Sequence, residues 1–488
     1  MNLFLRRGHW THTVAILLAG AGVFLYLWMS HQTYRIGFPL DDAWIHQTYA
    51  RNLAKGGEWA FIPGQPSAGS TAPLWSFLLA VGYWTSPSIP YGWTFFLGGM
   101  SLLGLMIVAQ NWFQRETGID LALGALLIGM EWHLLWAALS GMETALMAVL
   151  VLTVLWLMGA FQPWWGVMGI LIGVGIWIRP DAITLTAPVL LMWLWKFSRR
   201  EVQWIQAGKF LAGFLILFVP YIAFNWLISG SVFPNTFYAK QAEYALLYEI
   251  SVWVRFLRSF GVMLVGAGGL LLPGFVWGIF LAFREKRIAY LLTSAWVIGY
   301  VALYALRLPV TYQHGRYLMP AMPVYFVLAL MGTVQLVRGL SLRRWGWIIS
   351  RVWIGSIAGV TLGFVFLGAQ AYATDVAIIE TEMVETAQWV QQNTPSDALI
   401  AVHDIGAIGY FSQRKLVDLA GLVSPEVIPF IRDETRLRVF LDGQQVDYLV
   451  TFPGWYEHLT DGKPVVYQSR GKFAPQAGGE NMTVYRWR

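Results

Sequence analysis

The chain has 488 residues, of which 57% are hydrophobic and only 12% are charged, and its formal net charge is +6. This apolar share is well above that of a soluble domain, so the composition excludes an ordinary soluble protein and indicates a polytopic membrane protein. The absence of cysteine excludes disulfide bonds, thiolate metal sites and cysteine nucleophiles.

Apolar segments long enough to cross a hydrocarbon core of ~30 Å as helices recur from residue 12 to residue 371. The N-terminus has a basic start and an apolar run but no small-residue cleavage site, which predicts a retained signal-anchor helix. We predict about eleven membrane-spanning helices, at residues 12–29, 92–113, 121–139, 142–159, 165–179, 182–197, 208–228, 258–283, 288–306, 317–337 and 350–371. The apolar segment 73–84 is too short to cross, so we predict an interfacial or re-entrant helix there; the alternative is a short tilted span.

The Lys and Arg residues between these segments predict the orientation of the bundle, because such residues accumulate in cytoplasmic loops. Four clusters belong on one side under this topology: Arg6 and Arg7; Lys196, Arg199 and Arg200; Arg284, Lys286 and Arg287; and Arg338, Arg343 and Arg344. We therefore predict a multi-pass protein of the plasma (inner) membrane with a cytoplasmic N-terminus. The first outer loop, residues 30–91, and the C-terminal region then lie on the extracytoplasmic side.

The polarity of the sequence changes after residue 371, which predicts a transmembrane domain at residues 1–371 and an extracytoplasmic soluble domain at residues 372–488. A helical segment at 380–392 and strand-like runs at 398–402, 446–452, 464–468 and 482–487 predict a small α/β fold for the second domain. Within it, His403 and Asp404 follow a strand without other metal ligands nearby. We interpret this pair as a structural strand-to-turn element.

The adjacent carboxylates Asp41 and Asp42 stand in the first outer loop, just past the first apolar span. A carboxylate beside a membrane is costly unless it faces a polar cavity or a partner, so both are candidate catalytic residues. A carboxylate with a raised pKa in an apolar rim suits a general base that deprotonates an attacking hydroxyl. One of them is a candidate for this base and the other for holding a cation; the alternative for one of the two is a helix cap.

Two further motifs fall on the same predicted face. Glu143 in SGMETAL is either a second carboxylate on the outer rim or part of a capping box with Ser140. Arg179 and Asp181 in RPDA are candidates for substrate contacts, and their alternative is a local ion pair at a proline-marked turn.

Two outer segments have the chemistry to bind phosphate oxygens, through Arg, Lys and His side chains. They carry Asn235, Tyr238 and Lys240 in PNTFYAK, and His314, Arg316 and Tyr317 in HGRYLMP. We expect a helix that starts near Asp42. His46 lies one turn after Asp42 in this helix, so both side chains lie on the same helix face. The alternative for Arg316 is contact with lipid headgroups.

The order of these features resembles the GT-C superfamily of polytopic glycosyltransferases, which take their sugar from polyprenyl-phosphate donors. The resemblance covers nearly the full chain, from the first helix and the long outer loop to the multi-span core and the outward C-terminal domain. The motifs DDAWIHQTYARNLAKGG, GQPSAGSTAPLW, SGMETAL, RPDA, PNTFYAK and HGRYLMP look like the group that contains the mycobacterial cell-wall arabinofuranosyltransferase.

This resemblance implies an inverting transfer of a sugar from a polyprenyl-phosphate donor to a hydroxyl of a cell-envelope glycan, lipid or protein on the outer face of the membrane. It implies that Asp41 or Asp42 is the catalytic base and that Glu143 is the second rim carboxylate. The implied donor-phosphate residues are Lys240, His314, Arg316 and Tyr317, and the implied substrate residues are His46, Asn235, Tyr238, Arg179 and Asp181. A divalent metal ion stays open as a cofactor, and no nucleic-acid partner is expected.

The alternative hypothesis is a lipid-linked sugar flippase or another transporter, which also needs rim cations and a hydrophobic groove. A transporter is expected to bury charged residues in mid-span on both halves of its path, whereas the motifs here cluster on one predicted rim. A structural membrane subunit does not need adjacent acids that face Lys, His and Arg. No P-loop or GxGxxG fingerprint follows a strand, so a nucleotide-driven enzyme or pump is not indicated.

Overall fold

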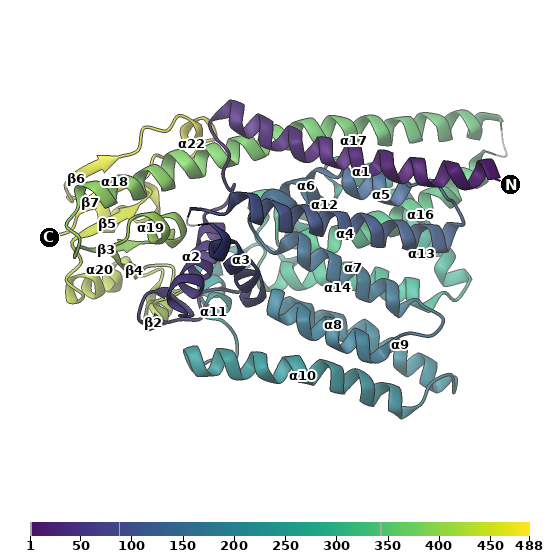
Figure 1. Ribbon diagram of the computed structural model, residues 1–488, viewed down its shortest axis with the longest axis horizontal. Coiled ribbons are helices and arrows are strands. Elements are labelled where there is room, and N and C mark those ends of the chain that lie inside the picture. Colours follow the sequence, from purple (N-terminus) through teal and green to yellow (C-terminus); the bar gives the residue numbers. More distant parts are fainter. Residues whose placement is uncertain (1, 87, 342–343) are drawn as a thin grey trace.

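The computed structural model describes residues 2–86, 88–341 and 344–488. Most of the chain is helical, and the long helices pack into a bundle that carries a smaller domain with a β-sheet at one end (Figure 1). The fold class predicted from the sequence, a polytopic helical membrane protein with a C-terminal α/β domain, is confirmed.

Seven helical segments among the described residues are long and apolar enough to cross a membrane. They are α1 (Asn2–Thr33), α4 (Tyr91–Thr117), α10 (Trp204–Ser229), α13 (Ala267–Arg284), α14 (Ile288–Arg307), the run that ends with α16 (Met322–Leu340) and the run that begins with α17 (Arg344–Ile378). Two shorter apolar helices, α7 (Thr144–Met158) and α8 (Trp165–Ile178), pack among them.

Three of the predicted spans are interrupted helices. Segment 121–139 is divided into α5 (Leu123–Gly129) and α6 (Trp132–Leu139), where Glu131 caps α6 by accepting a hydrogen bond from the Leu134 amide at 3.1 Å. Segment 182–197 consists of the last part of the short helix η1 (Pro180–Leu185) and of α9 (Thr186–Ser198). Segment 258–283 breaks at Gly266, whose φ of 85° ends α12 (Val252–Leu264) before α13 begins.

The loops that carry the predicted basic clusters lie at the end of the bundle opposite the C-terminal domain (Figure 1). A cavity of about 320 Å³ at this end has a basic lining that includes Arg115, Lys196, Lys286 and Arg287. Arg343 and the side chains of Arg6 and Arg7 lie outside the described residues. The shared end agrees with the predicted topology, while the cytoplasmic assignment stays a prediction.

The opposite end of the bundle carries the first outer loop. This loop folds into α2 (Asp41–Gly56), a hairpin of β1 (Ala60–Ile62) and β2 (Gln65–Pro66), and α3 (Pro73–Thr85), which packs on α2. Trp75 in α3 is buried and donates a hydrogen bond from Nε1 to the Gly141 carbonyl at 2.8 Å. The same end holds α11 (Asn235–Glu243), η2 (Ala245–Glu249), α15 (Tyr312–Gly315) and η3 (Met319–Ala321).

The C-terminal domain is built on a five-stranded sheet in the order β4-β3-β5-β7-β6. Its strands are β3 (Leu399–Val402), β4 (Lys415–Asp418), β5 (Tyr448–Thr451), β6 (Val465–Gln468) and β7 (Thr483–Arg486). β3 is parallel to β4 and β5, whereas β7 is antiparallel to β5 and β6. The sequence predicted every strand except β4, in which only Leu416 and Val417 are apolar.

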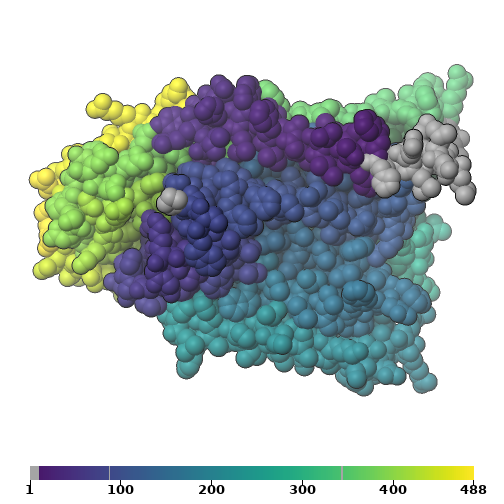
Figure 2. All heavy atoms as spheres, viewed as in Figure 1, coloured from purple at the N-terminus to yellow at the C-terminus, as the bar shows by residue number. Residues whose placement is uncertain are grey.

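The helices of this domain are short. They are α18 (Glu385–Asn393), α19 (Ile405–Phe411), η5 (Pro425–Phe430), α20 (Glu434–Gly443), η6 (Pro453–Trp455), α21 (Glu457–Thr460) and α22 (Phe473–Gln476). α19 follows the carboxyl end of β3 and packs against α2 of the first outer loop. The space-filling view shows the purple N-terminal segments and the green and yellow C-terminal domain in direct contact (Figure 2).

The two parts of the chain are joined by a continuous helical run. α17 passes residue 371 without a break and continues through a π-helical stretch (Ile379–Val384) into α18. Glu382 in this stretch is fully buried and accepts hydrogen bonds from the Met482 amide at 2.9 Å, from Asn481 Nδ2 at 3.1 Å and from the Ser469 hydroxyl. This one carboxylate therefore fixes the long helix to the segments that lead out of β6 and into β7.

Replacement of Glu382 by Ala is expected to destabilise the junction. Because three donors lose their acceptor inside the protein, we expect a loss of about 3 kcal/mol. Thermal unfolding of the purified full chain measures it, with Glu426→Ala as the control because Glu426 is exposed. Equal melting temperatures for the two variants contradict this role of Glu382.

Candidate active site

The two adjacent aspartates begin α2, and their side chains diverge. The N-cap of this helix is Leu40, and no side chain caps it, so the alternative that Asp41 or Asp42 merely caps its own helix is not what the structure contains. Both carboxylates still lie in the first turn, where the helix dipole favours negative charge. Each of them contacts a different part of the protein.

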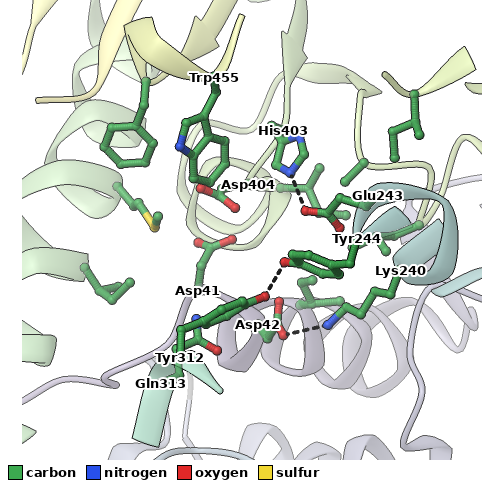
Figure 3. Close-up of a pocket in the computed structure, with 18 of the residues that line it drawn as sticks. Asp41, Asp42, Lys240, Glu243, Tyr244, Tyr312, Gln313, His403, Asp404 and Trp455 are labelled. Atoms are coloured by element: carbon green, nitrogen blue, oxygen red, sulfur yellow. Dashed lines mark hydrogen bonds and ion pairs between the residues drawn. The ribbon is translucent and has the colours of Figure 1, made fainter. Parts of the chain in front are cut away.

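Asp42 faces two cations. Its Oδ2 pairs with Arg316 Nη2. The same oxygen pairs with Lys240 Nζ at 3.3 Å (Figure 3). The Tyr317 hydroxyl joins the cluster, 2.7 Å from Lys240 Nζ and 3.0 Å from Arg316 Nη2. Burial by itself raises the pKa of Asp42, but the guanidinium and the ammonium outweigh it and hold that pKa well below its usual range. Asp42 is therefore ionised and paired with both cations.

Arg316 keeps unused hydrogen-bonding capacity. Its side chain is buried, with 4% of the residue exposed, and its Nε and Nη1 atoms have no hydrogen-bond partner among the described residues. It follows a left-handed turn in which Gln313, His314 and Gly315 have φ angles of 53°, 57° and 66°. Two of these residues are not glycine, so the turn is strained, and strain of this kind gathers at functional sites.

Asp41 faces the C-terminal domain. Its Oδ2 accepts a hydrogen bond from the Gly406 amide and its Oδ1 one from the Ala407 amide, each at 2.7 Å, so it caps α19 from a helix more than 360 residues away in sequence. Burial and the nearby carboxylate of Asp404 raise the pKa of Asp41, and the two amides only partly offset them. A Cβ at Gly406 would collide with the Asp41 backbone oxygen. The close approach of α2 to the start of α19 therefore requires glycine at this position.

Two cavities meet at the Asp42 cluster. The larger one, about 790 Å³, lies between α2, α11 and the C-terminal domain, and the smaller one, about 340 Å³, lies on the side of the helical bundle. Asp42, Lys240 and Arg316 line both. The apolar wall of the smaller cavity includes Met142, Ile183, Phe233, Phe237, Leu303 and Leu308, and its remaining cations are Arg179 and Arg307. The cluster thus separates an apolar, cationic cavity from a more polar one.

A second network stabilises the wall of the smaller cavity. Glu143 is buried, with Oε1 3.5 Å from Arg179 Nη1 and Oε2 3.5 Å from His46 Nε2. Arg179 also contacts Asp181 at 3.2 Å and the Tyr304 hydroxyl at 2.9 Å. The predicted local Arg179–Asp181 pair therefore exists within a larger network.

The capping-box alternative for Glu143 is wrong, because its side chain makes no capping hydrogen bond at the start of α7. His46 reaches this network from α2. Its Nδ1 lies 3.1 Å from the Ser76 hydroxyl and 3.2 Å from the Ser70 hydroxyl, which orients Nε2 toward Glu143.

Three predicted residues lie apart from the Asp42 cluster. His314 Nε2 pairs with Asp375 Oδ2 at 2.8 Å, and its ring packs edge-on against two tryptophans. Asn235 is buried and its Nδ2 donates to the Leu422 carbonyl at 3.4 Å. Tyr238 is 39% exposed and lines neither cavity. The structure therefore brings Lys240, Arg316 and Tyr317 together and leaves these three outside.

His403 and Asp404 line the larger cavity, together with Glu243. The sequence did not single out Glu243, and the interpretation of His403 and Asp404 as a purely structural turn missed their position in the cavity. A signal for them existed, because polar residues at the carboxyl end of a parallel strand are where α/β folds place ligands. Among the described residues, no group of three or more His, Cys, Asp or Glu side chains is placed to hold a metal ion.

Residues 369–485 match the model of a protein family described as a domain of unknown function (DUF8728). No curated protein matches the chain in sequence. Among solved structures, the chain is similar to ArnT from Cupriavidus metallidurans bound to undecaprenyl phosphate, with a TM-score of 0.59, 15% identity and 98% of each chain covered.

The chain is also similar to the oligosaccharyltransferase AglB from Archaeoglobus fulgidus in complex with an inhibitory peptide and a dolichol-phosphate. That comparison has a TM-score of 0.62 and 11% identity, and it covers 91% of this chain and 70% of the other. At these identities the likeness shows the fold alone, a helical bundle that carries a C-terminal domain, and membership of the GT-C superfamily stays a prediction. The finer likeness to the arabinofuranosyltransferase group stays a prediction.

Replacement of Asp404 by Asn is expected to stabilise the protein at neutral and alkaline pH. Burial raises the pKa of Asp404, so the folded chain binds its proton more tightly than the unfolded chain. The wild type therefore loses stability as the pH rises above about 4, and the amide does not. At pH 8 we expect the free energy of unfolding of Asp404→Asn to exceed that of the wild type by about 1–2 kcal/mol. This difference should disappear toward pH 4.

Thermal unfolding of the two purified proteins at both pH values measures this difference. Asp461→Asn serves as the control, because Asp461 is exposed on the same domain and its replacement should change neither value. A destabilised Asp404→Asn protein at pH 8 contradicts an unfavourable buried charge.

Proposed function

We propose that the chain is an inverting membrane glycosyltransferase that moves a sugar from a polyprenyl-phosphate donor to a hydroxyl of a cell-envelope glycan, lipid or protein. The observation that carries this proposal is the cluster of Asp42, Lys240 and Arg316, in which a buried guanidinium keeps two donors unpaired at the meeting point of two cavities. A phosphate group supplies the oxygens that such donors lack.

The smaller cavity suits the donor. Its apolar wall fits the first isoprene units of a lipid, and its cations fit a lipid-linked phosphate. ArnT, which has the same fold, binds undecaprenyl phosphate in its solved structure, and AglB binds a dolichol-phosphate. These likenesses support the class of donor; the sugar and the length of the lipid stay open.

The proposed reaction is a substitution at the anomeric carbon. The acceptor O–H bond breaks and its proton goes to a carboxylate, while the acceptor oxygen forms a bond to the anomeric carbon. The bond from that carbon to the phosphate oxygen breaks with its electron pair, and the polyprenyl phosphate leaves from the opposite face, which inverts the configuration. Lys240 and Arg316 stabilise the negative charge that develops on the leaving phosphate.

We assign the role of base to Asp41 and that of holding the cations to Asp42. A carboxylate with a low pKa that already pairs with two cations accepts a proton poorly, whereas one with a raised pKa accepts it well. Asp41 has the raised pKa and lines only the larger cavity, which leaves that cavity for the acceptor. The reaction is then proposed to take place at the extracytoplasmic face of the plasma (inner) membrane.

Asp41→Asn is expected to lower the rate of sugar transfer by about 100-fold or more, because the general base is lost. The measurement is transfer from a panel of synthetic polyprenyl-phosphate sugars to cell-envelope acceptors by the purified full chain. Retained binding of undecaprenyl phosphate shows that the variant is folded. Movement of donor lipid across proteoliposomes without any transfer contradicts the proposal and favours a lipid-linked sugar flippase.

Arg316→Gln and Lys240→Gln are each expected to weaken the binding of undecaprenyl phosphate by about tenfold, because each removes a charged hydrogen-bond donor. Asp42→Asn should bind it at least as tightly as the wild type, since the carboxylate that competes for these cations is gone. Titration of the lipid phosphate against the purified proteins measures the three affinities. The control is Arg470→Gln, an exposed position, and equal affinities throughout place the phosphate elsewhere.

A further inference from the structure

The C-terminal domain supplies one wall of the larger cavity, and this wall has no role in the proposed reaction. Figure 3 shows the carboxylates of Asp404 and Asp41 facing each other, with Trp455 and His403 on the same side as Asp404 and Glu243 paired with His403. His403, Asp404 and Trp455 come from the turn after β3 and from η6 in the C-terminal domain, whereas Glu243 comes from α11 and Asp41 from α2. The wall is thus assembled from segments that are far apart in sequence.

Asp404 is available to a ligand because another residue has taken its structural role. It stands at the N-cap of α19, where aspartate ordinarily caps the helix, yet its side chain makes no capping hydrogen bond. Asp41 accepts the hydrogen bonds from the Gly406 and Ala407 amides instead. The Asp404 carboxylate is therefore directed at the cavity and not at its own helix.

His403 is held in a fixed orientation next to Asp404. Its Nε2 lies 3.4 Å from Glu243 Oε1, and its Nδ1 lies 2.7 Å from the Tyr456 hydroxyl. The ring also packs edge-on against Trp455, with the ring centroids 4.8 Å apart. Burial favours the neutral imidazole, but the carboxylates of Glu243 and Asp404 outweigh it and raise the pKa of His403.

Carboxylates outnumber the Lys and Arg side chains in the lining of this cavity. Its carboxylates are Asp41, Asp42, Glu243, Asp375, Asp404 and Glu434, and its Lys and Arg residues are Lys240, Arg316 and Arg432. Two of these three cations belong to the Asp42 cluster, at the border with the smaller cavity. An anionic acceptor group placed beside Asp404 is repelled, whereas hydroxyl groups donate hydrogen bonds to the carboxylates.

Aromatic side chains complete the lining. Trp455 is 50% exposed, and Tyr244, Tyr312, Phe452 and Tyr456 line the same space. Flat aromatic faces beside fixed carboxylates offer an apolar surface to a sugar ring and acceptors to its hydroxyls. Arg316 also lines this cavity, so an acceptor there lies next to the proposed donor phosphate.

We propose that Asp404, with the His403–Glu243 pair, forms the acceptor subsite and selects a neutral glycan hydroxyl over an anionic group. The proposal rests on the proposed function and names the acceptor class for the same site. Asp404 is a positioning residue: it accepts a hydrogen bond from the acceptor glycan, and its charge increases the proton affinity of Asp41. The acceptor proton itself goes to Asp41.

The first test compares acceptors. Purified full chain in lipid nanodiscs is given synthetic undecaprenyl-phosphate sugars as donors and neutral oligosaccharides, or the same oligosaccharides with a phosphate group, as acceptors. The wild type should prefer the neutral acceptors by about tenfold in kcat/KM. Asp404→Asn should raise KM for the neutral acceptors, reduce that preference and leave the affinity for undecaprenyl phosphate unchanged. Asp461→Asn should behave like the wild type.

The pH profile separates positioning from a merely structural role. The charged groups that act on Asp41 or Asp404 are Asp42, His403, Glu243 and Lys240, in addition to their mutual repulsion. Removal of the Asp404 charge lowers the proton affinity of Asp41. In a plot of the transfer rate against pH, the acidic limb should therefore shift to lower pH for Asp404→Asn. It should stay in place for Asp461→Asn. An unshifted limb with an unchanged acceptor preference overturns the proposal.

A binding measurement keeps the subsite testable whether or not transfer occurs. Saturation-transfer NMR without donor should detect neutral oligosaccharides on the wild type and not on Asp404→Asn. If that variant does not fold, Glu243→Gln, which releases His403, should lose the same signal. Absence of any signal with the wild type overturns the subsite, whereas bound oligosaccharide without transfer from any donor overturns only the proposed function.

Discussion

The arrangement of the site depends on two carboxylates that are adjacent in sequence and therefore diverge at the start of α2. Asp41 accepts two amides at the start of α19 in the C-terminal domain, and Asp42 pairs with Lys240 and Arg316 from two other outer segments. A single turn of helix thus joins the membrane bundle, the outer loops and the soluble domain. Any shift of α2 along its axis disturbs all of these contacts together, so the position of the C-terminal wall and that of the cation cluster are coupled.

This arrangement includes several local features that lower its stability. Three features cost free energy: a buried guanidinium whose nitrogens have no partner among the described residues, two neighbouring carboxylates that repel each other, and a left-handed turn at Gln313 and His314. The surrounding structure offsets these costs with dry packing and with buried polar contacts such as that of Glu382 with the segments around β6 and β7. Costs of this kind, gathered around two connected cavities and compensated elsewhere, distinguish a binding site from an ordinary buried ion pair.

The sequence predicted the large-scale features well because they depend on local physics. Apolar run length located every helical segment of the bundle, and the position of charged residues just outside those runs located Asp41, Asp42, Lys240 and Arg316 on one rim. What sequence reasoning missed depends on contacts between distant segments. Asp41 caps α19 only after the two domains pack, and nothing near Asp404 in sequence shows that its capping role is taken. Likewise His314 is two residues from Arg316, but the left-handed turn between them directs it to Asp375.

The two cavities also order the proposed reaction. In the structure, Asp42 pairs with both cations that the proposed donor phosphate needs and offsets one of their two charges, so the arriving phosphate shares or displaces this carboxylate. Once the phosphate engages Lys240 and Arg316, the region around Asp41 gains negative charge that the cations no longer fully balance, and this raises the proton affinity of Asp41 further. The carboxylate that we propose as the base thus gains proton affinity when the proposed donor is in place. Activation of the hydroxyl is then coupled to donor binding through electrostatics alone, without movement of a lid.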